Sequence, residues 1–256
     1  MTFPPVLMLH HVEPEPLDPP PLHSNSYLSR REFGAFLDQL RAAGYQTATL
    51  AEACLRKLAR RTVVLTFDDG CRCFAEHAWP ELKSRGMAAT LFPVSGELGG
   101  TNRWDCADGE REERLLDGPA LAALAADGVE IGCHGRFHRD LTLCSDAELR
   151  EEVETARDEL TAAVGAPVRT FCYPYGRLSA RARAAVERAG YLGAASIHGA
   201  PEARADDRFA LPRMILNPGE SGFERRLKAA GLYPLWSRLP RLGLLSALRS
   251  RAGRAA

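Results

Sequence analysis

The sequence predicts an α/β fold, and within that class one closed or nearly closed β/α barrel. Short apolar runs rich in Val, Leu, Phe and Thr alternate with helical segments, a pattern typical of parallel strands joined by helical crossovers. Six or seven such units can be counted along the chain. No clear linker interrupts them before about Asn217, and this continuity favours one barrel over a doubly wound sheet.

In the first half of the chain, capping boxes mark where two helices begin. Ser29 and Thr49 are each followed three residues later by a glutamate, which can satisfy the first backbone N–H groups of a helix reciprocally. A proline-rich stretch before Ser29 is expected to be an extended surface loop. The predicted strands are 6–11, 45–50, 62–67 and 88–94, and the predicted helices are 30–43, 50–58 and 74–86 with an interruption at Pro80.

The second half repeats the alternation after a polar stretch with little periodicity, residues 95–117. Ser145 opens a third capping box and a long helix that should end at about Val164. The other expected helices are 119–128 and 179–190, and the expected strands are 129–134, 169–174 and 191–197.

Composition excludes several classes of protein. The 33 basic and 33 acidic residues balance, which gives no reason to expect a nucleic-acid partner. No apolar run approaches the ~20 residues of a membrane-spanning helix, and no basic segment precedes the first apolar run, so we expect a cytoplasmic location. The seven cysteines contain no Cys-x-x-Cys pair, which argues against a zinc ribbon. Cys71 and Cys73 are interpreted as two ordinary thiols.

Titratable side chains follow three of the predicted strands where each strand ends. Because the carboxyl ends of parallel strands meet at one edge of a barrel or sheet, these groups should converge on one site. They are His10 and His11 at the end of the first strand, Asp68 and Asp69 directly after the strand 62–67, and His134 at the end of the strand 129–134, with His138 four residues further on.

The adjacent aspartates can serve one site only if the strand breaks there, because successive side chains on a regular strand point to opposite faces. Gly70 permits such a break. The alternative is structural: Asp68 or Asp69 could cap a helix that follows the strand. From the aspartates alone, the two interpretations remain open.

The histidines favour the functional interpretation. "HGRFH", residues 134–138, is expected to be a tight loop, and two histidines with one carboxylate are a minimal set for a divalent metal with open positions. Such a metal lowers the pKa of bound water from 15.7 to roughly 7. A second carboxylate beside the metal could then accept the proton, so we expect one aspartate to be a ligand and the other a base.

Three motifs in order, "TFDDG", "HGRFH" and "FCYPYG", resemble the signature of the polysaccharide deacetylases, carbohydrate esterase family 4. The resemblance extends over roughly Val6 to Leu216. It implies a distorted (β/α) barrel with about seven parallel strands and a divalent metal ion, usually Zn²⁺. It also implies a hydrolase that removes N-acetyl groups from amino sugars.

The resemblance also implies a role for individual residues. Asp68 would be the general base, and the backbone N–H of Tyr175 would stabilise the oxyanion. The implied metal ligands are Asp69, His134 and His138.

The general acid is implied by the branch of the family that carries its catalytic histidine on the N-terminal strand. By alignment this is His10, although Leu9 replaces the tyrosine usual before it. The late Leu-x-His motif of other branches is missing, since the last histidine, His198, lies in a different context. His11 remains an alternative. In a regular strand only one of the two neighbouring histidines should face the site.

Some positions depart from the family pattern or have no assigned role. Gly135 replaces the usual Ser or Thr, and Cys172 stands where many relatives carry an arginine that orients the base. Cys133 and Cys172 are interpreted as small apolar fillers. Trp104 could line a sugar-binding cleft or anchor a loop, and both remain open.

The domain prediction is a barrel over residues 1–217 and a basic C-terminal tail over 218–256. From Asn217 onward, eight Lys or Arg face two Glu. We expect this tail to be helical and docked on the barrel, with weak contact to a membrane surface as the alternative.

The predicted function is that of a metal-dependent N-deacetylase acting on an N-acetylated polysaccharide, oligosaccharide or lipid-linked saccharide. Two alternatives remain. One is a related metal hydrolase that cleaves a non-peptide C–N bond of a small molecule, and the other is a catalytically silent carbohydrate-binding barrel. A complete ligand set argues against the silent barrel.

Overall fold

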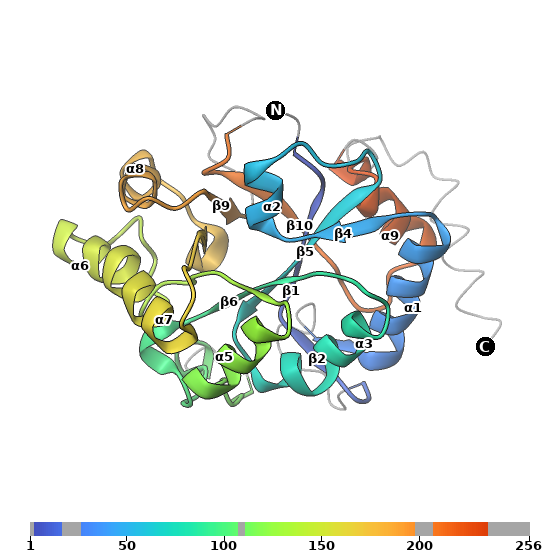
Figure 1. Cartoon of the computed structure of the whole chain (residues 1–256), viewed down its shortest axis with the longest axis horizontal. Helices are drawn as coiled ribbons and strands as arrows, with labels where there is room; N and C mark the ends of the chain where they lie inside the picture. The colour runs from blue at the N-terminus through green and yellow to red at the C-terminus, as the bar shows by residue number, and fades with distance from the viewer. Residues whose placement is uncertain (1–2, 17–26, 107–110, 198–206, 235–256) are drawn as a thin grey trace.

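The computed structural model describes residues 3–16, 27–106, 111–197 and 207–234. Seven parallel strands form the barrel in the order β7-β6-β5-β1-β10-β9-β8. A single parallel bridge between Cys133 and Phe171 joins the two outer strands, so the barrel is nearly closed, as predicted (Figure 1). The strands are β1 (Val6–Leu9), β5 (Thr62–Asp69), β6 (Thr90–Pro93), β7 (Glu130–Ile131), β8 (Thr170–Cys172), β9 (Gly193–Ser196) and β10 (Leu211–Ile215).

Three further strands complete the described sheets. β4 (Gln46–Ala48) pairs with β5 outside the main path, and β2 (His11–Glu13) pairs with β3 (Tyr27–Ser29) in a separate two-stranded sheet. Neither that small sheet nor β10 was predicted. β5 is the longest strand, and all eight of its residues are buried, because it pairs with β1 on one side and β6 on the other. It therefore delivers its carboxyl end to the middle of the barrel rim.

Helices surround the strands, with α1 and α9 on one side and α5 and α7 on the other (Figure 1). The predicted capping boxes at Ser29, Thr49 and Ser145 are confirmed. The second helix ends at Leu55, three residues earlier than predicted. The α-helices are α1 (Arg30–Ala42), α2 (Leu50–Leu55), α3 (Trp79–Lys83), α4 (Arg103–Cys106), α5 (Gly118–Ala126), α6 (Asp146–Arg150), α7 (Ala156–Val164), α8 (Ala180–Arg188) and α9 (Gly222–Ala229).

Three of these helices are continuous with π-helical segments: η2 (Phe74–Ala78) leads into α3, and η4 (Glu151–Thr155) joins α6 to α7. The predicted interruption at Pro80 corresponds to the first segment. Proline cannot donate the backbone hydrogen bond of a regular helix, and the turn before it widens. The short 3₁₀ segments are η3 (Ser95–Glu97) and η5 (Pro174–Gly176).

The start of the predicted tail, α9, packs on α1 and on the end of β10. The Arg225 side chain donates to the backbone oxygen of Glu32 at 3.0 Å, and the Lys228 ammonium donates to Ile215 and to Glu220. Residues 235–256 lie outside the described residues, as does His198, so the tail's boundary and any membrane contact stay predictions. Across the described ranges, no helix has the length and apolar character needed to span a bilayer.

Candidate active site

A pocket of about 130 Å³ opens at the carboxyl ends of the strands. It brings together all six residues that the sequence predicted for the site. Its lining also includes residues to which no role was assigned, among them the polar side chains of Tyr27, Asn102, Asp105 and Arg213. The predicted residues in its lining are His10, Asp68, Asp69, His134, His138 and Tyr175, and the alternative acid His11 lines it as well.

The end of β5 is bent, and this bend turns both aspartates toward the pocket. Asp69 has φ of 69° and Gly70 has φ of 79°, both in the left-handed region that side chains avoid. A Cβ at Gly70 would lie 2.8 Å from the Cβ of Pro93, so only glycine fits there. The predicted strand break is confirmed. The capping alternative is wrong, because η2 begins without a side-chain cap.

The negative charge of Asp68 is balanced by an arginine that sequence reasoning missed. Arg213, on β10, donates to both oxygens of Asp68 at 2.6 and 2.7 Å, and both side chains are buried. Burial raises the pKa of Asp68, but the charge and hydrogen bonds of Arg213 outweigh it and hold the pKa well below its usual range. Arg213 therefore keeps this carboxylate ionised and fixes its orientation.

Asp69 faces the two predicted histidine ligands. Its Oδ1 atom lies 3.6 Å from Nε2 of both His134 and His138, and it is buried without a hydrogen-bond partner. Ligand atoms about 2.0–2.2 Å from one tetrahedral ion lie about 3.3–3.6 Å apart. The spacing of these three residues therefore fits a single divalent ion.

The orientation of His134 supports the same interpretation. Its Nδ1 lies 2.8 Å from the carbonyl oxygen of Cys172, so this nitrogen donates and the Nε2 lone pair faces Asp69. Such a second hydrogen bond is the usual way a metal-binding histidine is held. Burial lowers the pKa of His134 to about 4 and that of His138 well below its ordinary value, so both rings are neutral at neutral pH.

The charge balance also fits a cation at this position. Burial, followed by the charge of Asp68, raises the pKa of Asp69 well above its ordinary value when no cation lies beside it. Within the described residues, both hydrogen bonds that Arg213 donates to carboxylate oxygens go to Asp68, so it does not pair with Asp69. A divalent ion would supply the positive charge that keeps Asp69 ionised.

The loop from His134 to His138 is tight rather than helical, as predicted, and a buried glutamate supports it. Glu152, in η4, accepts hydrogen bonds from the backbone N–H groups of Arg136 at 2.9 Å and Phe137 at 3.1 Å. Gly135 has φ of 83°, and a Cβ there would lie 2.6 Å from the Glu152 carboxylate. A residue with a side chain would therefore collide with Glu152 at this position. The sequence offered no signal for Glu152 except its place in a long amphipathic helix.

His10 and His11 at the end of the first strand are placed differently from the prediction. β1 ends at Leu9 and β2 begins at His11, so His10 lies in a break between strands and both histidines line the pocket. The expectation that only one would face the site assumed a regular strand and is wrong. His10 Nε2 lies 3.9 Å from Asp68 Oδ2. His11 is buried against Tyr27, and burial, then the charges of His10 and Arg111, lower its pKa to about 3.

Two aromatic residues enclose His138. The ring of Tyr175 lies edge-on at 4.6 Å and that of Trp104 is stacked at 4.7 Å between centroids. Tyr175 adopts φ of 58° in η5, which sets the direction of its peptide N–H group, and its side chain is 41% exposed. Trp104 therefore packs on a proposed ligand, and whether it also contacts sugar stays a prediction.

The cysteines have the predicted character. All seven are free, and Cys133 and Cys172 are fully buried. The Cys172 sulfur lies 3.7 Å from both oxygens of Asp68, and burial raises its pKa well above its ordinary value. It fills space behind Asp68, while its backbone oxygen accepts a hydrogen bond from His134.

Residues 56–194, more than half of the chain, match the model of the polysaccharide deacetylase family. The chain belongs to this family. YxkH of Bacillus subtilis strain 168, named for the same family, is 27% identical to this deacetylase over 224 residues, which cover 85% of this chain and 73% of YxkH.

Two solved structures show the same fold. The deacetylase PplD of Streptococcus pyogenes, solved in complex with acetate, is 21% identical with a TM-score of 0.73, covering 89% of this chain and 98% of PplD. A de-N-acetylase of Aggregatibacter actinomycetemcomitans is 18% identical with a TM-score of 0.71, covering 88% and 98%. Family membership makes the chain a hydrolase that removes N-acetyl groups from polysaccharide with the help of a divalent metal.

Proposed function

We propose that this deacetylase binds one Zn²⁺ ion through Asp69, His134 and His138 and uses Asp68, His10 and Tyr175 to hydrolyse the acetamide of an amino sugar. The observation that carries the proposal is the placement of Asp69 Oδ1 at 3.6 Å from both histidines, beside a base already neutralised by Arg213. Nitrogen and oxygen ligands with an open position suit zinc.

When bound by these three residues, the ion would lower the pKa of a water molecule and polarise the acetyl carbonyl. Asp68 accepts the proton of that water, since Arg213 keeps its carboxylate ionised and aimed at the pocket. A carboxylate of such low pKa is a weak base. It can act here because the proton comes from a water that is already acidified.

Two further groups act on the amide itself. The backbone N–H of Tyr175 donates to the carbonyl oxygen as negative charge develops on it. An amine leaves poorly unless it is protonated, so His10, 3.9 Å from Asp68 and 22% exposed at its side chain, donates a proton to the departing nitrogen. The products are acetate and a free amino sugar.

The experiment is acetate release by the metal-loaded protein from N-acetylglucosamine oligomers of increasing length, with N-acetylated small molecules in parallel. Release from the oligomers that disappears in Asp68→Asn supports the proposal. Turnover of only the small molecules would favour a different C–N hydrolase. Absence of turnover on every substrate by fully loaded protein would contradict catalysis at this site.

A further inference from the structure

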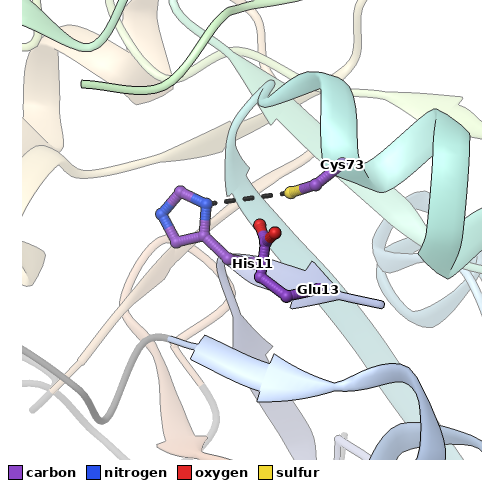
Figure 2. Close-up of side chains that lie close together, drawn as sticks. All are labelled: His11, Glu13 and Cys73. Carbon is purple, nitrogen blue, oxygen red and sulfur yellow. Dashed lines mark hydrogen bonds between the residues drawn. The ribbon is translucent and has the colours of Figure 1, made fainter. Parts of the chain in front are cut away.

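A second group of ligand-type side chains lies beside the pocket. His11 and Glu13 come from β2, and Cys73 comes from the turn between β5 and η2, and the three side chains converge (Figure 2). All three are buried, and their ligand atoms lie within 4.8 Å of one another. None of the three has a role in the proposed deacetylation.

The spacing in this group suits a metal ion. The Nδ1 atom of His11 lies 3.7 Å from the Sγ atom of Cys73 (Figure 2). A tetrahedral ion with a sulfur ligand at about 2.3 Å and a nitrogen ligand at about 2.0–2.1 Å separates the two by about 3.6 Å. Thiolate, imidazole and carboxylate together form a donor set that suits Zn²⁺.

The neighbouring residues hold the three donors in place. The Tyr27 ring stacks on His11 with centroids 4.2 Å apart and planes at 9°, which fixes the imidazole orientation. Burial raises the pKa of the Cys73 thiol well above its ordinary value, and the backbone N–H of Val12, which faces the sulfur, offsets only part of this rise.

The charge of Glu13 is not matched by a close cation. Among the described residues, its one ion pair is with Arg111, at 3.9 Å, which exceeds a hydrogen bond. Arg111 lies closer to Glu113, at 3.1 Å. The carboxylate of Glu13 therefore remains available to a cation between it and Cys73.

We propose that His11, Glu13 and Cys73 form a second metal site, which binds a borderline-soft divalent ion such as Zn²⁺ and is separate from the Asp69 centre. On binding, the Cys73 thiol releases its proton to solvent, and the thiolate and Glu13 together balance the two charges of the ion. The fourth position is open to water. Glu13 and Cys73 lie outside the pocket lining, so this ion does not occupy the catalytic position.

His11 connects this second site to the pocket. It lines the pocket, and it also has a ligand atom within 4.8 Å of ligand atoms of Asp69 and Cys71. An ion bound through Nδ1 of His11 would fix the ring that forms the pocket wall beside Asp69. We therefore assign the second site a structural role at the edge of the active site.

The experiment is titration of the metal-free full chain with Co²⁺ and Zn²⁺. We expect two bound equivalents of Zn²⁺ and, with Co²⁺, a near-ultraviolet thiolate-to-cobalt absorption band. Cys73→Ser should lose the band and one equivalent, while Cys54→Ser, which removes another buried free thiol, should keep both. His134→Ala should retain the band, since His134 belongs to the other centre.

His11→Gln provides a second variant in case Cys73→Ser does not fold, with circular dichroism as the check on folding. This variant should lower the affinity for Co²⁺ at least tenfold, as followed by the thiolate-to-cobalt band. One equivalent in the wild-type chain, or a thiolate band unchanged in Cys73→Ser or in folded His11→Gln, would overturn the proposal.

Discussion

The two sides of the pocket surround a buried carboxylate with different charges. On the β10 side, Arg213 forms two short hydrogen bonds with Asp68, so the protein supplies the opposite charge itself. On the side of the 134–138 loop, Asp69 faces two neutral histidines and leaves one oxygen without a hydrogen bond. Two residues adjacent in the sequence thus face opposite electrostatic surroundings.

This difference shows how a pair of aspartates can divide one reaction. A carboxylate paired with arginine stays ionised at any working pH. Its negative charge is already balanced by the guanidinium group, so it attracts a metal ion less strongly. The ionised form of a buried carboxylate among neutral imidazoles is unfavourable by itself, and a bound divalent ion makes it favourable. The comparison predicts that removing groups on the two sides will separate catalysis from metal binding.

The largest expected effect is on the Asp68 side. Asp68→Asn should lower kcat by roughly 10²–10⁴ while metal content stays near that of the parent protein, because asparagine cannot accept a proton. Acetate release and elemental analysis of the same sample measure both quantities. Near-normal turnover would mean that Asp68 is only structural.

The next effect is on stability and pH dependence, through Arg213. Arg213→Gln leaves Asp68 buried without its partner, which costs about 3–5 kcal/mol of unfolding free energy. In the parent protein the lowered pKa of Asp68 contributes stability above its unfolded pKa, and that contribution is lost as pH falls through the lower folded value. In the variant the pKa of Asp68 rises, so the acid limb of the kcat/KM profile should move to higher pH.

A matched control is Arg225→Gln, which removes another buried arginine, one that is paired with Glu32 and does not line the pocket. It should lower stability without moving the acid limb. If the limb stays in place in Arg213→Gln as well, Arg213 does not act through Asp68.

A smaller effect, about 10²-fold in kcat, is expected for His10→Ala, with metal content unchanged. The limb of the pH profile that reports the general acid should disappear. His11→Ala should keep both limbs, because His11 is neutral at working pH, with a pKa of about 3. If His11→Ala removes the limb and His10→Ala leaves it, the two assignments must be exchanged.

The smallest expected effect concerns the loop that presents the histidines. Glu152→Ala removes the acceptor for two backbone N–H groups and should weaken Zn²⁺ affinity by about 10–100-fold. Glu151 lies on the same helical segment, and the ion pairs that the described part of the chain shows for it are with the side chains of Arg136 and Arg139, so Glu151→Ala should change affinity little. Equal affinities in the two variants would show that Glu152 does not orient the ligands.

The helix starts and the turns at the site could be predicted from the sequence, because each is determined by residues close to it in the chain. Capping boxes at Ser29 and Ser145 set helix starts, and Gly70 and Gly135 allowed the turns that place the aspartates and histidines. Each of these signals lies within a few residues of the feature it determines.

The groups that the sequence did not predict depend on long-range packing. Arg213 lies 145 positions from Asp68 on a short strand that contains a proline, so nothing local indicates either a strand or a partner. The inward direction of both His10 and His11 depends on a break between β1 and β2 that two short apolar stretches do not reveal.

The most direct test of the central claim is the metal content of Asp69→Asn beside that of Asp68→Asn, each compared with the parent protein. The account predicts that Asp69→Asn loses about one equivalent of divalent metal, while Asp68→Asn loses none. His134→Ala should match Asp69→Asn, because both belong to the same ligand set. Equal metal retention in Asp69→Asn and Asp68→Asn would contradict the division of roles between the two aspartates.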